Sequence, residues 1–139
     1  MAKTLTLRLA AFIALIVSAF ACRDLPKIGD LAGQWQVTRI EYTNGTTVEN
    51  PLRYYCFYRE VANLTGAGSL TAEIIYNKPE LTLVFPDTPP EKLASWGIPV
   101  ADTEPSAEGT TRVNFHIARL TSSALVLTLP SVTITLRKY

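Results

Sequence analysis

The chain has 139 residues, a length that suits one domain and leaves no room for a second sizeable core. Its 13 basic and 12 acidic residues nearly cancel without forming a basic run, which excludes nucleic acid as a partner. One histidine and two cysteines cannot supply the usual metal ligand sets or a disulfide-dense scaffold. The sequence contains no G-x-S-x-G elbow and no phosphate-binding glycine loop. It therefore predicts a protein that is not an enzyme and that holds no metal and no cofactor.

The first 21 residues have the three parts of a secretory signal peptide. Lys3 and Arg8 supply a positive start, residues 9–20 are mostly apolar, and the small Ala21 closes the segment. The apolar run of about 12 residues is too short to cross a bilayer of roughly 30 Å as a helix. We therefore predict a signal peptide over residues 1–21. Without its two basic residues, the remaining chain has 11 basic and 12 acidic residues, a net charge of −1.

Two interpretations of Cys22 remain open. Directly after the apolar run, the stretch that ends in Ala21-Cys22 resembles a bacterial lipobox. Cys22 would then carry acyl chains such as palmitate, and residues 22–30 would tether the chain to the membrane. This reading predicts a lipid-anchored protein of the cell envelope at the outer membrane, without indicating which face. In the other reading Ala21 ends an ordinary signal peptide, and Cys22 is left as a thiol that could pair with Cys56.

The first strand of the mature chain is predicted over residues 34–43, which are rich in β formers. Its alternation breaks midway, because Trp35 and Val37 share one face and Ile40 and Tyr42 the other. A bend or bulge near Thr38-Arg39 would allow both pairs to point inward. A short helical turn is predicted just before this strand.

Further short strands follow at regular spacing, with turn signals between them. They are predicted over residues 53–63, 69–76, 80–85, 111–120, 124–129 and 132–136. Residues 46–52 are polar and predict a loop. The pattern predicts an all-β domain, either an antiparallel barrel or a sandwich, and a closed barrel would leave no exposed edges.

Residues 86–109 form the one long interruption between strands and hold five of the nine prolines. Pro89 and Pro90 can open a helical turn that Gly97 ends. Trp96 and Ile98 are apolar enough to dock the segment onto the domain. A loop of this length usually has a function of its own.

Tyrosines provide the most suggestive cluster for a binding site. Aromatic rings with a polar tip suit a pocket for a sugar or a small apolar molecule. The candidate ligand-binding residues are Tyr42, Tyr54, Tyr58 and Tyr76. The alternative is that a small barrel fills its own interior with such rings. Because both faces of residues 54–58 are aromatic, periodicity does not decide which face is inside, and Cys56 among them is interpreted as a small core residue.

The segment Gly33-Gln34-Trp35, on the first strand after a short helical lead-in, resembles the lipocalins and the wider calycin group. The opening and the end of the chain also look like lipocalin-like lipoproteins of Bacteroidetes. The resemblance implies a small antiparallel up-and-down β-barrel over residues 31–139. It further implies that Gly33 permits a tight entry into the barrel, that Trp35 plugs one end, and that Arg137 packs across the indole.

Two hypotheses of function follow. In the first, the chain is a non-enzymatic, membrane-anchored lipocalin-like lipoprotein that binds a small apolar or sugar-like ligand in the barrel or at its mouth. In the second, the barrel is filled, and the chain is a structural or interaction module of the envelope that docks a protein partner through residues 86–109. The packing of the barrel interior distinguishes them, because ligand binding inside needs a connected cavity of roughly 300 Å³ or more.

Overall fold

The computed structural model describes residues 28–139. The predicted signal peptide and Cys22 therefore lie outside the described residues. The elements are η1 (Gly29–Leu31), β1 (Gly33–Tyr42), β2 (Thr47–Glu49), β3 (Tyr54–Tyr58), β4 (Val61–Thr65), β5 (Ser69–Asn77), β6 (Glu80–Phe85), η2 (Pro90–Trp96), η3 (Val100–Asp102), β7 (Thr103–Pro105), β8 (Thr111–Leu120), β9 (Ala124–Leu129) and β10 (Val132–Lys138), where η denotes a 3₁₀ helix.

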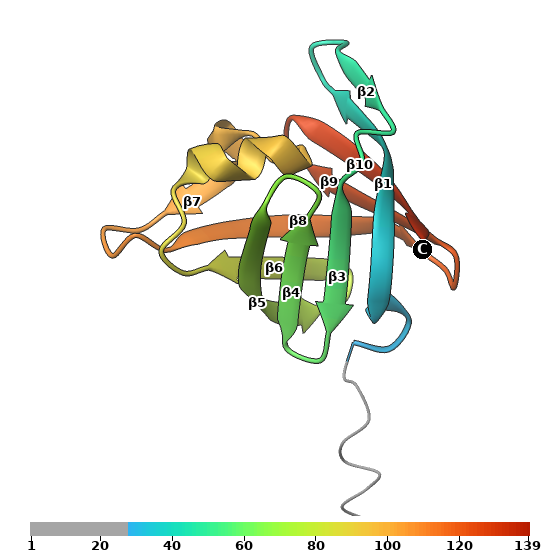
Figure 1. Cartoon of the computed structure of the whole chain (residues 1–139), viewed down its shortest axis with the longest axis horizontal. Coiled ribbons are helices and arrows are strands. Elements are labelled where there is room, and N and C mark those ends of the chain that lie inside the picture. The colour runs from blue at the N-terminus through green and yellow to red at the C-terminus, as the bar shows by residue number, and fades with distance from the viewer. Residues whose placement is uncertain (1–27) are drawn as a thin grey trace, which may run out of the picture.

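Eight of these strands close into one antiparallel barrel (Figure 1). Starting from β1, each strand pairs with the next along the series β3, β4, β5, β6, β8, β9 and β10, and β10 pairs back onto β1. The closing pair runs from Trp35 opposite Lys138 to Tyr42 opposite Val132. The predicted all-β, up-and-down barrel is confirmed, because every barrel strand lies beside its neighbour in sequence.

Because successive barrel strands run in opposite directions, the connections between them fall in turn at the two ends of the barrel. The N-terminal end, defined by η1, holds the turns after β3, β5 and β8 together with the C-terminus. The loop end holds the connections after β1, β4, β6 and β9, including residues 86–110. Contacts confirm the grouping at the N-terminal end, because Gly33 pairs with Phe57 and the backbone N–H of Lys138 donates to the carbonyl of Ser123.

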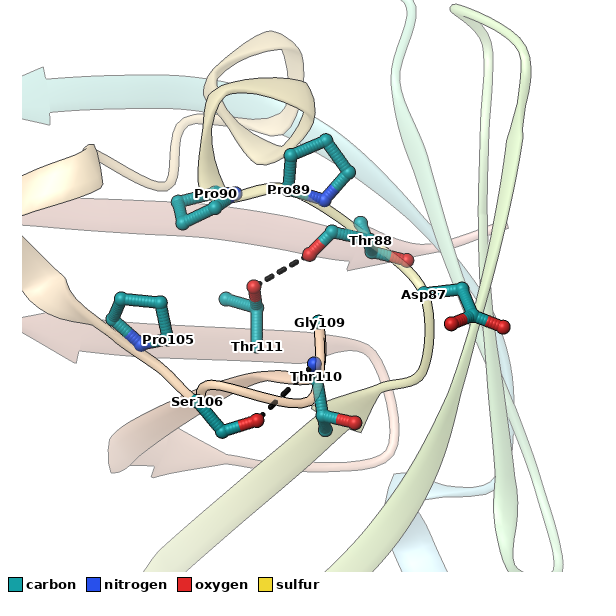
Figure 2. Close-up of a pocket in the computed structure, with 9 residues that line it drawn as sticks. All are labelled: Asp87, Thr88, Pro89, Pro90, Pro105, Ser106, Gly109, Thr110 and Thr111. Atoms are coloured by element: carbon teal, nitrogen blue, oxygen red, sulfur yellow. Dashed lines mark hydrogen bonds between the residues drawn. The ribbon is translucent and has the colours of Figure 1, made fainter.

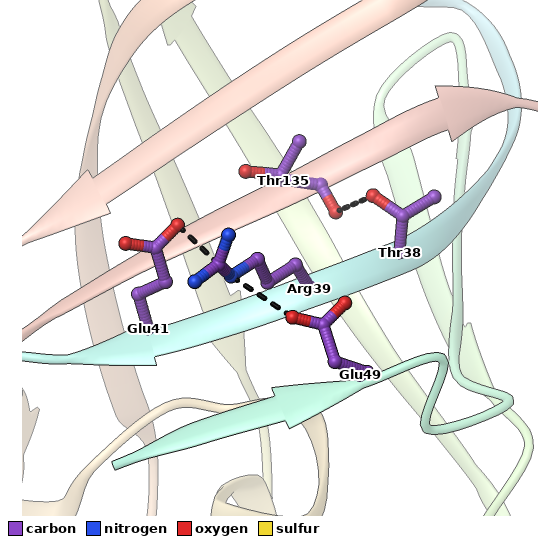
Figure 3. Close-up of polar contacts among 5 residues, drawn as sticks. All are labelled: Thr38, Arg39, Glu41, Glu49 and Thr135. Carbon is purple, nitrogen blue, oxygen red and sulfur yellow. Dashed lines mark hydrogen bonds and ion pairs between the residues drawn. The ribbon is translucent and has the colours of Figure 1, made fainter. Parts of the chain in front are cut away.

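A β-bulge in β1 occurs where the alternation predicts it. The register of β1 against β10 shifts between Val37 and Arg39, and the Thr38 hydroxyl donates to the carbonyl of Thr135 at 3.1 Å (Figure 3). As a result Val37 and Ile40 are both buried. The extra residue reverses the alternation of side chains after Thr38, so that apolar side chains from both halves of β1 point into the core.

Two short strands were not predicted. Residues 46–52 were predicted as a loop, but β2 pairs with the outer half of β1, with Arg39 opposite Glu49. The Arg39 guanidinium lies 3.0 Å from Glu49 and 3.2 Å from Glu41, all three side chains being half-exposed (Figure 3). The second missed strand, β7, lies within the long connection of residues 86–109 and pairs with β8. Both are three residues long, too short for a periodic signal.

The single strand predicted over residues 53–63 is wrong, because the segment forms the hairpin of β3 and β4. Arg59 and Glu60 make the turn, and Arg59 has a φ of 56°. Neither residue is a usual turn former, so the sequence carries no signal for the break. In β3 the inward side chains are Tyr55 and Phe57, and Cys56 is half-buried on the outer face. The prediction of Cys56 as a core residue is therefore corrected.

Candidate functional site

The barrel interior is filled by the chain's own side chains. Inward residues from all eight barrel strands belong to one buried cluster. Large side chains that the solvent does not reach at all come from strands all around the barrel. They include Trp35, Phe57, Leu83, Phe115 and Leu127. The rings of Tyr55 and Phe115 meet across this interior, with centroids 6.5 Å apart. The space that holds a ligand in an open barrel is therefore occupied by protein.

Trp35 closes the N-terminal end. Its indole is fully buried, and its Nε1–H donates to the carbonyl of Leu31 at 2.9 Å. This bond ties η1 across the barrel end and satisfies the one polar atom that burial of the indole would otherwise leave unpaired. The predicted structural role of Trp35 agrees with this geometry.

Lys138, not Arg137, provides the cation that packs on the indole. The Lys138 ammonium lies 4.5 Å from the Trp35 ring centroid and also donates to the carbonyl of Ala32. Arg137 is opposite Gln36 in the ladder and points outward, donating twice to the Gln36 side-chain oxygen at 2.9 and 3.1 Å. The sequence prediction for Arg137 is one residue out of register, because only every second side chain shares a face with Trp35.

Gly33 allows the lysine to reach this position. Its φ is 123°, a conformation that residues with a side chain rarely adopt. A Cβ at this position would lie 2.6 Å from the Lys138 ammonium nitrogen. Gly33, Trp35 and Lys138 thus form one unit at the start of the barrel.

The second tryptophan, Trp96, belongs to the segment that covers the loop end. The 3₁₀ helix η2 lies over this end of the barrel (Figure 1), with Leu93, Trp96 and Ile98 buried. The Trp96 Nε1–H donates to the carbonyl of Thr65 at 2.8 Å. In return, the buried hydroxyl of Tyr55 donates to the Trp96 carbonyl at 2.7 Å. The predicted helical turn and its docking through Trp96 and Ile98 are confirmed.

Further contacts fix this cover in place. The Arg53 Nε–H donates to the carbonyl of Ser95 at 2.9 Å. Gly97 ends η2 with a φ of 83°, and a Cβ there would lie 2.9 Å from the Ile40 side chain. Burial, with a smaller contribution from Tyr42, raises the pKa of Tyr55, so its hydroxyl stays protonated as a donor. Sequence analysis missed Arg53 and the Tyr55 hydroxyl, because neither has a signal in sequence spacing.

The four candidate tyrosines do not form one interior site. Tyr58 is 66% exposed on the outer face of β3, and Tyr54 packs against Tyr139 with ring centroids 5.3 Å apart. Tyr42 lies towards the loop end, opposite Val132. Tyr76 lies near the N-terminal end, where burial and Asp30 raise its pKa. Alternation turns Tyr55 inward and leaves its neighbours in β3 outside, whereas Tyr42 and Tyr76 are partly buried against the core at opposite ends of the barrel. Ligand binding by the four tyrosines stays a prediction.

Among residues 28–139, hollows open to solvent lie beside the long connection and at the N-terminal end of the barrel. The first has a volume of about 420 Å³ and is lined by Asp87, Thr88, Pro89, Pro90, Pro105, Ser106, Gly109, Thr110 and Thr111. Figure 2 shows Pro89 and Pro90 on one side of it and Pro105 and Ser106 on the other. The Thr111 hydroxyl donates to the Thr88 carbonyl at 2.6 Å, which joins the two ends of the long connection (Figure 2).

The second hollow lies at the N-terminal end and has a volume of about 470 Å³. It is lined by Ile28, Gly29, Asp30, Tyr76, Asn77, Lys78 and Leu120. Ile28, the first residue that the structure describes, is part of the wall of this hollow.

Polar chemistry for catalysis is sparse within residues 28–139. His116 Nδ1 lies 3.2 Å from a carboxylate oxygen of Glu80, but both side chains are more than half exposed. An exposed pair of this kind lacks the desolvation that tunes a catalytic acid or base. In the same part of the chain, no group of three or more metal-binding side chains converges. No helix among the described residues is long and apolar enough to cross a membrane.

Comparison with known proteins agrees with the barrel. A family model described as a lipocalin-like domain matches residues 15–139. A lipocalin-like protein from Bacteroides uniformis ATCC 8492 is 22% identical with a TM-score of 0.60, and the match covers 80% of this chain and 100% of that one. An uncharacterized protein from Bacteroides eggerthii DSM 20697 is 18% identical with a TM-score of 0.56, covering 78% of this chain and 99% of that one. Among curated proteins no significant match was found. At these identities the two structures show a shared fold alone.

Proposed function

The chain belongs to the family of lipocalin-like domains. We propose that it is a non-enzymatic lipoprotein of the cell envelope that acts as an interaction module. Lipid on Cys22 anchors it to the outer membrane, and its barrel is a filled scaffold rather than a cup. A protein partner docks on the outside, through residues 86–109.

The observation that carries this proposal is the occupied interior. Trp35 and η1 close one end, and η2 with Trp96 covers the other. Between them the inward side chains form one buried cluster, so a ligand would have to displace the core. The packing therefore argues against the hypothesis of a ligand inside the barrel. It leaves the outer surface as the place for recognition.

Residues 86–109 are favoured as the docking segment for two reasons. They form the longest connection of the barrel, and such connections usually carry function. They also border the hollow of about 420 Å³, which is lined by prolines and hydroxyl groups. A hydrogen bond from the Thr111 hydroxyl to the Thr88 carbonyl joins the two ends of this segment. Proline-rich walls lose little conformational entropy when a partner binds.

Native mass spectrometry of the protein purified from its own host tests the filled barrel. We expect the mass of the polypeptide and its lipid, with no further small molecule. A photo-crosslinking residue placed at Ser106 should capture one discrete protein in cells. The same residue at Thr71, exposed on the outer face of β5, is the control and should not capture it. A stoichiometric small molecule, or equal capture from both positions, would contradict the proposal.

The lipid anchor is tested separately. Mass spectrometry of the mature N-terminus should show acylated Cys22 as the first residue. An unmodified Cys22, or a mature chain that begins elsewhere, would refute the anchor and leave the filled barrel unaffected.

A further inference from the structure

Three exposed apolar side chains gather on the outer face of β3, β4 and β5. Tyr58 is 66% exposed, and Val61 and Ile75 are each 47% exposed. Tyr58 is directly opposite Val61, and Val61 is opposite Glu73. Ile75, two residues beyond Glu73, therefore lies diagonally next to Val61 on the same face. We name Tyr58, Val61 and Ile75 the β3–β5 patch.

This patch lies at the N-terminal end of the barrel. Phe57, the residue before Tyr58, pairs with Gly33 at the start of β1. Tyr76, the residue after Ile75, lines the same hollow as Ile28. Figure 1 shows β1 starting at the end of the barrel where β3 and β4 turn. Ile28, the first residue that the structure describes, thus lies at the same end of the barrel as the patch.

Charged side chains of both signs border the patch: the exposed Glu60 and Glu73 lie beside Val61, and Arg59 and Lys78 are the basic neighbours. The Arg59 guanidinium lies 5.5 Å from the ring centroid of Tyr58, a distance at which a cation is attracted to an aromatic face. Lys78, in the turn after β5, lines the hollow that Ile28 enters. Long basic side chains can place their charge at lipid phosphates while their stems cover apolar surface.

The two ends of the barrel differ in charge. At the loop end acidic residues outnumber basic ones: Glu41, Glu49, Asp87, Glu91, Asp102, Glu104 and Glu108 against Arg39, Arg53, Lys92 and Arg112. The N-terminal end is almost balanced: Asp30, Glu60, Glu73 and Glu80 against Arg59, Lys78, Arg119, Arg137 and Lys138. An anionic lipid surface therefore repels the N-terminal end less than the loop end.

We propose that the β3–β5 patch rests on the membrane surface. Tyr58, Val61 and Ile75 enter the headgroup region, and Arg59 and Lys78 pair with lipid phosphates. Tyrosine is a residue that favours this interface. The inference deepens the proposed anchoring and rests on it: five residues lie between Cys22 and Ile28, so a lipidated Cys22 lies at most about 22 Å from Ile28. The contact would fix the orientation of the barrel and turn residues 86–109 away from the membrane.

Vesicle binding without the anchor tests the patch. The chain from position 22 with Cys22→Ser keeps the whole closed barrel, since all barrel strands lie within residues 28–139. It is sedimented with vesicles of phosphatidylethanolamine and phosphatidylglycerol. Replacing the three patch residues by serine should lower the partition coefficient about tenfold or more. Replacing Arg59 and Lys78 by glutamine should lower it about fivefold per residue, and high salt should reproduce that loss.

The loop end offers a matched control. Val48, Leu52 and Val100 are three exposed apolar residues at that end, with exposures of 37, 60 and 48%. Their replacement by serine removes a comparable apolar surface and should change vesicle binding less than about twofold. Circular dichroism and thermal midpoints of both triple variants verify that each remains folded.

A second measurement uses the lipidated protein and does not depend on removing the patch. An environment-sensitive fluorophore is attached at Ile75→Cys or at Val48→Cys in a Cys56→Ser background. In vesicles with brominated acyl chains, the label at position 75 should shift to the blue and be quenched. The label at position 48 should do neither.

Three results would overturn the proposal. The first is equal vesicle binding by the patch and control variants, or no binding at about 1 mM lipid. The second is equal quenching at positions 75 and 48. The third is self-association in sedimentation that the patch variant abolishes while vesicle binding is unchanged, which would assign the patch to a second copy of the chain. Failure of the anchor itself is read independently from the mature N-terminus.

Discussion

The two ends of the barrel are closed by the same kind of residue in different settings. At the N-terminal end Trp35 lies within β1, paired with β3 on one side and β10 on the other. At the loop end Trp96 lies in the connection between β6 and β8 and reaches the barrel through bonds to Thr65 and Tyr55. One closure is part of the strand ladder, and the other is a cover laid over it.

The difference teaches where the barrel can open. Backbone pairing on both sides holds Trp35, so removing it would leave a hole that the strands cannot close. The cover depends on three buried side chains and on hydrogen bonds from Arg53, Tyr55 and Trp96. A connection outside the ladder unfolds locally at a lower free energy than the strands do.

The largest effect is expected from Trp35→Ala. Loss of a fully buried indole from a paired strand should lower the free energy of unfolding by ~4 kcal/mol. Denaturation in urea measures it. Trp35→Phe keeps most of the volume and serves as the control, with a loss about half as large. A loss below ~1 kcal/mol in Trp35→Ala would show that the N-terminal closure is not part of the core.

Trp96→Ala should cost less, ~2–3 kcal/mol, because the connection can partly collapse into the space. It should also leave the space of the removed indole at the loop end, where a small apolar fluorescent probe can bind. Titration with 1-aminoanthracene should then show binding that the unmodified chain and Trp35→Phe lack. If Trp96→Ala binds no probe, the cover is not what closes this end.

Tyr55→Phe removes the hydroxyl that holds the cover and should cost ~1 kcal/mol near neutral pH. The substitution also changes the pH dependence. Burial raises the pKa of Tyr55 above its value of 10.0 in an unfolded chain. Its contribution is therefore complete below pH 10 and falls as pH rises, because the unfolded state releases a proton that the folded state keeps.

The pH experiment compares the two proteins directly. Between pH 10 and 11, the unmodified protein should lose ~1 kcal/mol more of its free energy of unfolding than Tyr55→Phe does. Urea denaturation at each pH measures both. Parallel pH profiles for the two proteins would contradict the burial of this hydroxyl.

The smallest effect separates Lys138 from Arg137. Lys138→Met should cost ~0.5–1 kcal/mol and alter the fluorescence of Trp35, because the cation over the ring is lost. Arg137→Met, its neighbour in β10, should leave that fluorescence unchanged. Both are measured in a Trp96→Phe background so that Trp35 is the single emitter. Identical spectra for the two variants would contradict the assignment.

Strand periodicity and turn residues were enough to predict an all-β domain of short antiparallel strands, and the resemblance at Gly33-Gln34-Trp35 favoured a barrel over a sandwich. In residues 80–85 and 111–120 the alternation of apolar and polar residues is regular, and Leu83 and Phe115 fall on the apolar faces that the structure buries. The break at Thr38 also followed from the sequence, because only a bulge brings both halves of β1 to the core. Pro90 and Gly97 bracketed the helical turn in the long connection, since each has a fixed role at helix ends.

Other features depend on contacts that the sequence does not encode locally. In β3 both faces are aromatic. Tyr55 points inward because it lies opposite the inward-pointing Trp35 in the β1–β3 ladder. The register of β10 against β1 decides whether Lys138 or Arg137 meets the indole, and a shift of one residue reverses the answer. The candidate tyrosines were chosen by composition, so they scattered over both ends and the outside of the barrel.

The most direct test of the central claim, that the barrel is filled and closed at both ends, is a fluorescence titration of the unmodified chain with 1-aminoanthracene and with a long-chain fatty acid as competitor. The account predicts no saturable binding at probe concentrations up to about 100 µM. A barrel with an open ligand pocket of roughly 300 Å³ or more should bind the probe in this range. Saturable binding of one probe per chain, displaced by the fatty acid, would contradict it.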